Sequence, residues 1–137
     1  MKSTEEVKRK AAELHQPFAD FFHEQLDRDI PDVAEQLRII DAFCELLKVT
    51  ASNRLHEIKG DGIKQPLPFA LGGKYSSLKE PTEQWFAKHL PETYGTEIDQ
   101  WRVTGYLCER MMEMCANELD ALALQDEAEN RKVKIYQ

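Results

Sequence analysis

Residues 96–129 read TEIDQWRVTGYLCERMMEMCANELDALALQDEAE and contain no proline and only one glycine, Gly105. Thr96 suits the N-cap of a helix because its hydroxyl can accept a hydrogen bond from an otherwise unpaired backbone N–H. Asp99, three residues on, completes an approximate capping box, and acidic residues suit the positive end of a helix dipole. The stretch therefore predicts one long helix that begins at Thr96.

Apolar side chains cover more than half of the circumference of this helix. One face, with apolar residues three, four or seven apart, consists of Trp101, Cys108, Met112, Cys115 and Leu119. The adjoining face consists of Val103, Leu107, Met111 and Met114. A surface helix needs an apolar stripe of only about 100°, so this helix is either central in a bundle or shared with a second subunit. We expect the first face to pack against residues 31–59. The second is either covered by residues 60–90 or binds a partner.

The remaining helices are predicted by caps and by apolar spacing. Ser3 and Glu6 form a capping box, and Pro17 is expected to kink the first helix without ending it, because the apolar spacing keeps its phase. Gly60 is expected to end the second helix as a left-handed cap. The predicted fold is an all-α helical bundle of three long helices (about 3–28, 31–59 and 96–129), one short helix (81–90) and a long ordered loop (60–80).

At 137 residues the chain predicts a single helical domain over 1–130, followed by a basic C-terminal tail over 131–137. No apolar run reaches the roughly 20 residues of a membrane-spanning helix, and the N-terminus lacks the apolar core of a signal peptide. Three cysteines are an odd number, which fits a reducing compartment better than a disulfide framework. The sequence therefore favours a cytoplasmic protein.

The net charge of −7 is unevenly distributed along the chain. Residues 20–45 hold eight acidic and two basic residues, and residues 109–129 hold seven acidic and one basic, whereas residues 46–88 hold seven basic and four acidic. Acidic helices disfavour direct binding to nucleic acid, whose backbone is negatively charged. They permit binding to a basic partner, including imitation of nucleic acid, although they are also typical of solvated helix faces.

No catalytic motif is complete in the sequence. Gly72, Gly73 and Lys74 resemble part of a phosphate-binding loop, but Pro68 and Tyr75 stand where that motif needs Gly and Ser or Thr. No cysteine or serine has the context of a nucleophile. The four histidines lack zinc-type spacing.

One set of carboxylates offers an alternative. Glu109, Glu113 and Asp120 lie on one strip of the last predicted helix, and such oxygen ligands could hold Mg²⁺. All-α nucleotide pyrophosphohydrolases of the MazG type use one Glu-Glu-x-x-Glu helix and one Glu-x-x-Asp helix, and this chain departs from both patterns. The alternative is an all-α Mg-dependent hydrolase of a phosphorylated small molecule, with Lys64 or Lys74 touching phosphate.

The function that we expect is non-catalytic, with no cofactor: a small helical protein that binds another protein, as an adaptor, an inhibitor or an immunity-type regulatory factor. Its partner is expected to be basic or nucleic-acid-binding, and homodimerisation through the last helix is expected too. The predicted partner-binding residues are Val103, Leu107, Met111, Met114, Lys64, Lys74 and Tyr75.

Overall fold

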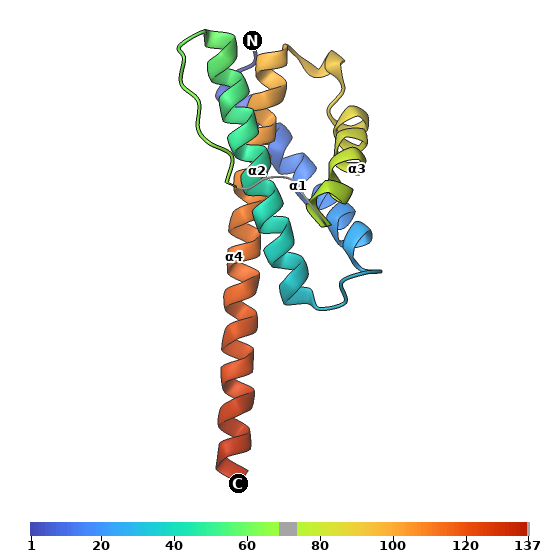
Figure 1. Ribbon diagram of the computed structural model, residues 1–137, viewed down its shortest axis with the longest axis vertical. Coiled ribbons are helices and arrows are strands. Elements are labelled where there is room, and N and C mark those ends of the chain that lie inside the picture. The colour runs from blue at the N-terminus through green and yellow to red at the C-terminus, as the bar shows by residue number, and fades with distance from the viewer. Residues whose placement is uncertain (69–73, 137) are drawn as a thin grey trace.

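The described part of the protein consists of four α-helices and one short 3-10 helix, shown in Figure 1. The structure is a computed structural model and describes residues 1–68 and 74–136. Its elements are α1 (Thr4–Leu26), α2 (Val33–Lys59), α3 (Lys74–His89), η1 (Glu92–Tyr94) and α4 (Glu97–Tyr136). The predicted all-α bundle of three long helices and one shorter helix is confirmed.

The ends of the helices follow the local chemistry of the sequence. Ser3 Oγ accepts a hydrogen bond from the Glu6 amide at 3.2 Å, so the predicted capping box begins α1. Gly60 ends α2 with a φ of 72°, in the left-handed region, where a side chain would be strained. α1 runs through Pro17 without a break.

α4 is the central helix. α1 and α2 both pack against it, as Figure 1 shows. Buried aromatic rings fill the space toward α3: Phe18 of α1 lies 4.6 Å from Phe22 and 4.5 Å from Trp85 of α3, measured between ring centroids. The wide apolar arc of α4 thus has two neighbours to cover it.

α3 begins at Lys74, seven residues before the predicted start at Pro81. The prediction placed residues 74–80 in the loop because residues 60–80 contain four glycines and two prolines, which disfavour a long regular element. In the structure Leu78, Thr82 and Trp85 are all buried, and their spacing of four and three puts them on one helical face. Burial of that face stabilises α3 enough for the helix to continue through Pro81, although proline has no backbone N–H to donate.

The segment after α2 packs less than expected. Residues 60–80 were predicted to form an ordered loop, but its apolar side chains are not all covered, since Leu67 is 53% exposed and Ile63 is 54% exposed. Two hydrogen bonds fix the backbone of this segment to α2 instead. The side-chain amide of Asn53 donates to the Gln65 carbonyl at 2.9 Å and accepts from the Gln65 backbone N–H at 2.8 Å. Residues 69–71 of the predicted loop lie outside the described residues.

α4 extends through Tyr136, beyond the predicted end at residue 129. The backbone of residues 131–136, predicted as a basic tail, is therefore helical. No helix in the described part of the chain has the length and apolarity needed to cross a bilayer.

Candidate functional site

Most of the predicted partner-binding face lies in the core. Val103, Leu107 and Met111 are all 0% exposed, so the expectation that they form a binding surface is wrong for the folded monomer. These residues are buried because α4 packs against both α1 and α2, and covering two sides of a helix needs an apolar arc wider than that of a surface helix. Met114 is partly buried and packs against the same core.

The other predicted residues lie outside the bundle core. Lys64 is exposed in the segment that follows α2. Tyr75 is half-buried in the first turn of α3, where it packs against the core. Lys74 is the first residue of α3, and its side chain lies outside the described part of the structure.

The three carboxylates of the hydrolase alternative do not gather at one point. Glu109 forms an ion pair with Lys48 of α2, at 3.3 Å, while Glu113 and Asp120 are exposed on α4. Since a helix rises 1.5 Å per residue, Glu109 and Asp120 are about 16 Å apart along the axis. Among the described residues, no three His, Cys, Asp or Glu side chains are placed to hold one metal ion.

The exposed surface of α4 is found further along the same helix. Every side chain from Ala123 to Lys132 is exposed. Figure 1 shows why: the last part of α4 continues past the ends of α1 and α2 with no element beside it. From Ala123 to its end at Tyr136, this part is about 20 Å long. We call residues 123–136 the projecting segment.

A narrow apolar strip runs along this part of the helix. Ala121, Leu124 and Ala128 are three and four residues apart and therefore share one face. Leu124 is 67% exposed, more than any other large apolar side chain that the structure describes except Met1. Two alanines beside one leucine leave room for another helix to approach closely.

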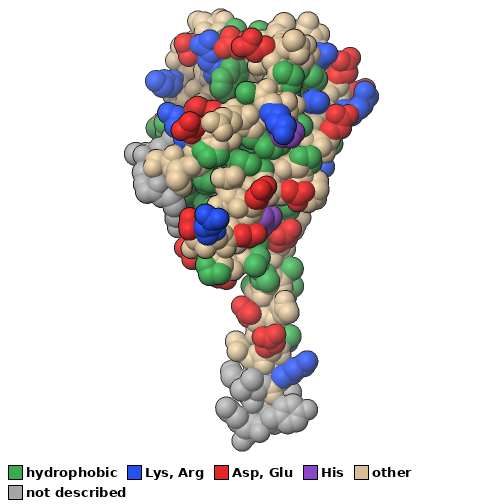
Figure 2. Space-filling model, turned by 90° about the vertical axis from the view of Figure 1, so that its right-hand side faces the viewer, with side chains coloured by type: hydrophobic (Ala, Val, Ile, Leu, Met, Phe, Trp, Pro, Cys, Tyr) green, Lys and Arg blue, Asp and Glu red, His purple; other side chains and the backbone are tan. Residues whose placement is uncertain are grey.

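Acidic residues border the strip on both sides. At about 100° per residue, Asp120 and Glu127 lie along one edge and Glu118 and Glu129 lie beyond the other. All four side chains are exposed. Figure 2 shows this part of the protein as a narrow stem that carries acidic side chains and, nearer its end, a basic one. The geometry up to Glu129 is that of a lone helix with an apolar strip between acidic edges, and the exposed Arg131 and Lys132 make the helix basic beyond that point.

The helix persists there because of its composition. Alanine, leucine, glutamate and glutamine, which dominate residues 116–129, are strong helix formers. A helix without tertiary contacts is nevertheless only marginally stable in water. Docking a second helix on the strip would therefore stabilise the projecting segment as well as bury Leu124.

The exposure of Leu124 was not predicted from the sequence, because the spacing of apolar residues is the same before and after the point where the core ends. Leu119 and Leu122 continue the row of Cys108 and Cys115, and both pack against the core. The available signal was length, because the helix predicted at 96–129 is longer than the one predicted at 31–59. In the structure α4 has 40 residues and α2 has 27, so part of α4 extends past its neighbour.

No protein-family model, curated protein or solved structure matches the chain.

Proposed function

We propose that this protein is a non-catalytic binding protein that takes a basic, helical segment of another protein on the strip around Leu124. The observation that carries the proposal is the exposure of Leu124 on a helix that extends beyond its own bundle. Burying one leucine side chain stabilises a complex by about 1.5–3 kcal/mol. A helix laid along the strip would bury Leu124 and both alanines in one contact.

The carboxylates on either side of Leu124 select the partner. Glu118, Asp120, Glu127 and Glu129 border the strip and are exposed. Lysine or arginine side chains on the edges of an incoming helix would meet these carboxylates, in the way that flanking charges choose partners in coiled coils. The same carboxylates oppose the parallel pairing of two copies of this chain, because like charges would face each other.

Acidic edges also affect how fast the partner arrives. Opposite charges raise the rate of association, and the effect weakens as salt screens it. A nucleic-acid-binding protein is one source of such a basic helix, and the protein would then compete with nucleic acid for it.

The test is a photocrosslinker placed at position 124 in cells of the native host. As a control, the same group is placed at Asn130, which lies about 120° around the helix from the strip. We expect position 124 to capture one protein through a basic helical segment, and position 130 not to capture it. Binding of the purified pair should weaken steeply with salt.

Leu124→Glu then tests the contact directly. It should weaken binding at least about tenfold, the effect of losing one buried leucine, whereas Asn130→Glu adds the same charge away from the strip and should have little effect. Capture of a second copy of this chain alone would refute the proposal, as would binding that depends neither on salt nor on Leu124. Light scattering on the purified protein separates the first of these outcomes from partner binding.

A further inference from the structure

The apolar strip on the projecting segment ends in an arginine that lies in line with it. Arg131 is three residues after Ala128 and seven after Leu124, so it lies within about 20° of Leu124 around the helix. Along the axis the two residues are about 10 Å apart. Arg131 is exposed. A positive charge therefore stands in the strip itself, whereas the carboxylates stand on its edges.

The other end of the strip is polar but uncharged. Asn117 is seven residues before Leu124, lies in the same row and is exposed. The row from Asn117 to Arg131 is about 21 Å long, with the apolar residues in its middle. A helix that covers the apolar part over a few turns reaches both ends, so it meets an amide at one end and a guanidinium at the other.

The side chain of Arg131 has the direction and chemistry to take part in such a contact. Side chains on a helix tilt toward its N-terminus, which brings Arg131 back toward Ala128 and Leu124. The hydrocarbon part of an arginine covers apolar surface while its guanidinium stays polar. A guanidinium that a docked helix partly covers needs acceptors, and a carboxylate provides two in matching geometry.

The position of Arg131 also restricts the register of a docked helix. In coiled coils, one polar residue within the apolar row fixes how the two helices align. Basic side chains on the edges of the partner meet Asp120 and Glu127, which border the strip. A basic side chain opposite Arg131 would instead place two positive charges together. The edges and the row therefore require opposite charges on the partner.

We propose that the partner helix carries a carboxylate in its apolar row, two turns from the residue that packs on Leu124, and that this carboxylate pairs with Arg131 and sets the register. This inference rests on the proposed function, because it concerns the same strip and the same basic helix. A uniformly basic helix lacks the carboxylate, so Arg131 discriminates between basic helices that the acidic edges alone would accept.

The test uses the purified protein and two designed peptides of about 20 residues, close to 30 Å long as helices. Both have leucines along one face and lysines on its two edges. One peptide has glutamate in its apolar row two turns before and two turns after the central leucine, and the other has glutamine at both places. Either orientation thus brings one of these residues to Arg131 and the other to Asn117. Glutamate and glutamine have similar helix propensities.

Fluorescence anisotropy of labelled peptides measures the two dissociation constants. We expect the glutamate peptide to bind about threefold to fivefold more tightly, the effect of one partly exposed charge pair. The net charge of −7 favours the glutamine peptide, which is the more basic of the two. A preference for glutamate therefore reports a local contact and not the overall charge.

Arg131→Gln should abolish the preference for the glutamate peptide. Arg9→Gln is the matched control, because it removes the same charge from an exposed arginine near the start of α1, at the opposite end of the molecule from the projecting segment (Figure 1). It should retain the preference. Leu124→Glu should weaken the binding of both peptides.

The outcomes separate this inference from the proposed function. Binding that depends on Leu124 but is equal for the two peptides would overturn the pairing with Arg131 and leave the strip as a site for a basic helix. A preference that persists in Arg131→Gln would do the same. If neither peptide binds at millimolar concentration, or if binding ignores Leu124, both proposals are wrong.

Discussion

Replacing Asp99 with asparagine should destabilise the protein by about 2 kcal/mol at neutral pH. Asp99 is 1% exposed, and its carboxylate accepts hydrogen bonds from the Lys2 amide at 3.0 Å and the Thr96 amide at 3.1 Å, on different oxygens. The Thr96 hydroxyl adds a third at 3.0 Å. Arg102, 3.5 Å away, also donates to the Lys2 carbonyl, so this cluster ties the N-terminus of the chain to α4.

The magnitude follows from the number of acceptors. Asparagine has one carbonyl oxygen, so its amide NH₂ group must face the backbone N–H of either Lys2 or Thr96. At least one hydrogen bond to a charged group is then lost, and such a bond contributes about 1.5–3 kcal/mol.

The effect should depend on pH in a defined direction. Burial opposes ionisation of Asp99, but hydrogen bonds from Thr96 and Lys2 outweigh it and lower the pKa of Asp99 below its ordinary value of 3.8. As the pH falls, the unfolded chain therefore takes up this proton first. The stabilisation is fully present above the unfolded pKa and is lost as the pH falls through the folded one.

Urea unfolding followed by circular dichroism, between pH 7 and pH 2, measures both effects. The difference between wild type and Asp99→Asn should be largest at pH 7 and should shrink below about pH 4. Asp32→Asn is the matched control, because Asp32 is the exposed N-cap of α2 and makes no capping hydrogen bond. It should change stability by less than about 0.5 kcal/mol. The reasoning fails if Asp99→Asn matches the control at pH 7, or if its deficit is the same at pH 3.

Two glycines and two thiols give further predictions. Gly95→Ala should destabilise the protein by about 1–3 kcal/mol, because its Cβ would lie 2.8 Å from Asp99 Oδ2; Gly105→Ala, with no atom within 4 Å, should stabilise it by up to about 1 kcal/mol. Thermal unfolding measures both, and equal effects would contradict the steric argument. Burial raises the pKa of Cys115 to about 12 and that of Cys44 well above its ordinary value. Neither thiol should react with Ellman's reagent at pH 8 until urea unfolds the protein, and prompt reaction would show that the core opens.

The sequence was sufficient for the features that depend on neighbouring residues. The capping box of Ser3 and Glu6, the left-handed Gly60 and the pairing of Thr96 with Asp99 all depend on groups within four residues of each other. The periods of the apolar residues supplied the helix type and the approximate bounds. These signals are local, and therefore a single sequence contains them.

Features that depend on distant contacts were not predictable in the same way. The early start of α3 rests on Leu78 and Trp85, and Trp85 packs against Phe18 of α1. No local pattern reveals that contact, whereas Pro81 is a visible local signal that favoured a later start. An apolar cavity between α2, α3 and α4 was not predicted for the same reason, because the side chains that line it, among them Phe43, Phe86 and Trp101, come from three helices.

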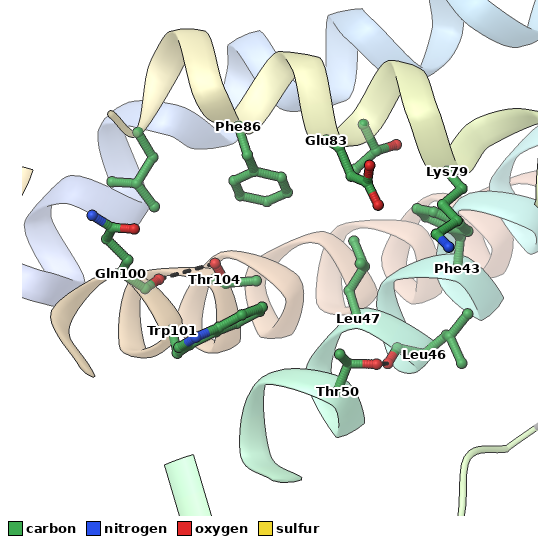
Figure 3. A pocket seen from close by; sticks show the side chains of 12 residues that line it. Phe43, Leu46, Leu47, Thr50, Lys79, Glu83, Phe86, Gln100, Trp101 and Thr104 are labelled. Carbon is green, nitrogen blue, oxygen red and sulfur yellow. Dashed lines mark hydrogen bonds between the residues drawn. The ribbon is translucent and has the colours of Figure 1, made fainter. Parts of the chain in front are cut away.

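The apolar cavity lined by residues of α2, α3 and α4 (Figure 3) and the strip around Leu124 both include residues of α4, and they lie far apart along it. Thr104, beside the cavity, and Leu124, on the strip, are 20 residues apart, about 30 Å along one uninterrupted helix. Between them Leu107, Met111 and Cys115 are 0% exposed, so that part of the helix is held in the core. Coupling between two sites requires an element with two arrangements. We therefore expect binding at Leu124 to leave the packed part of α4, and the cavity beside Thr104, unchanged. Substitutions at Thr82, which lines the cavity, therefore serve as controls for partner binding at Leu124.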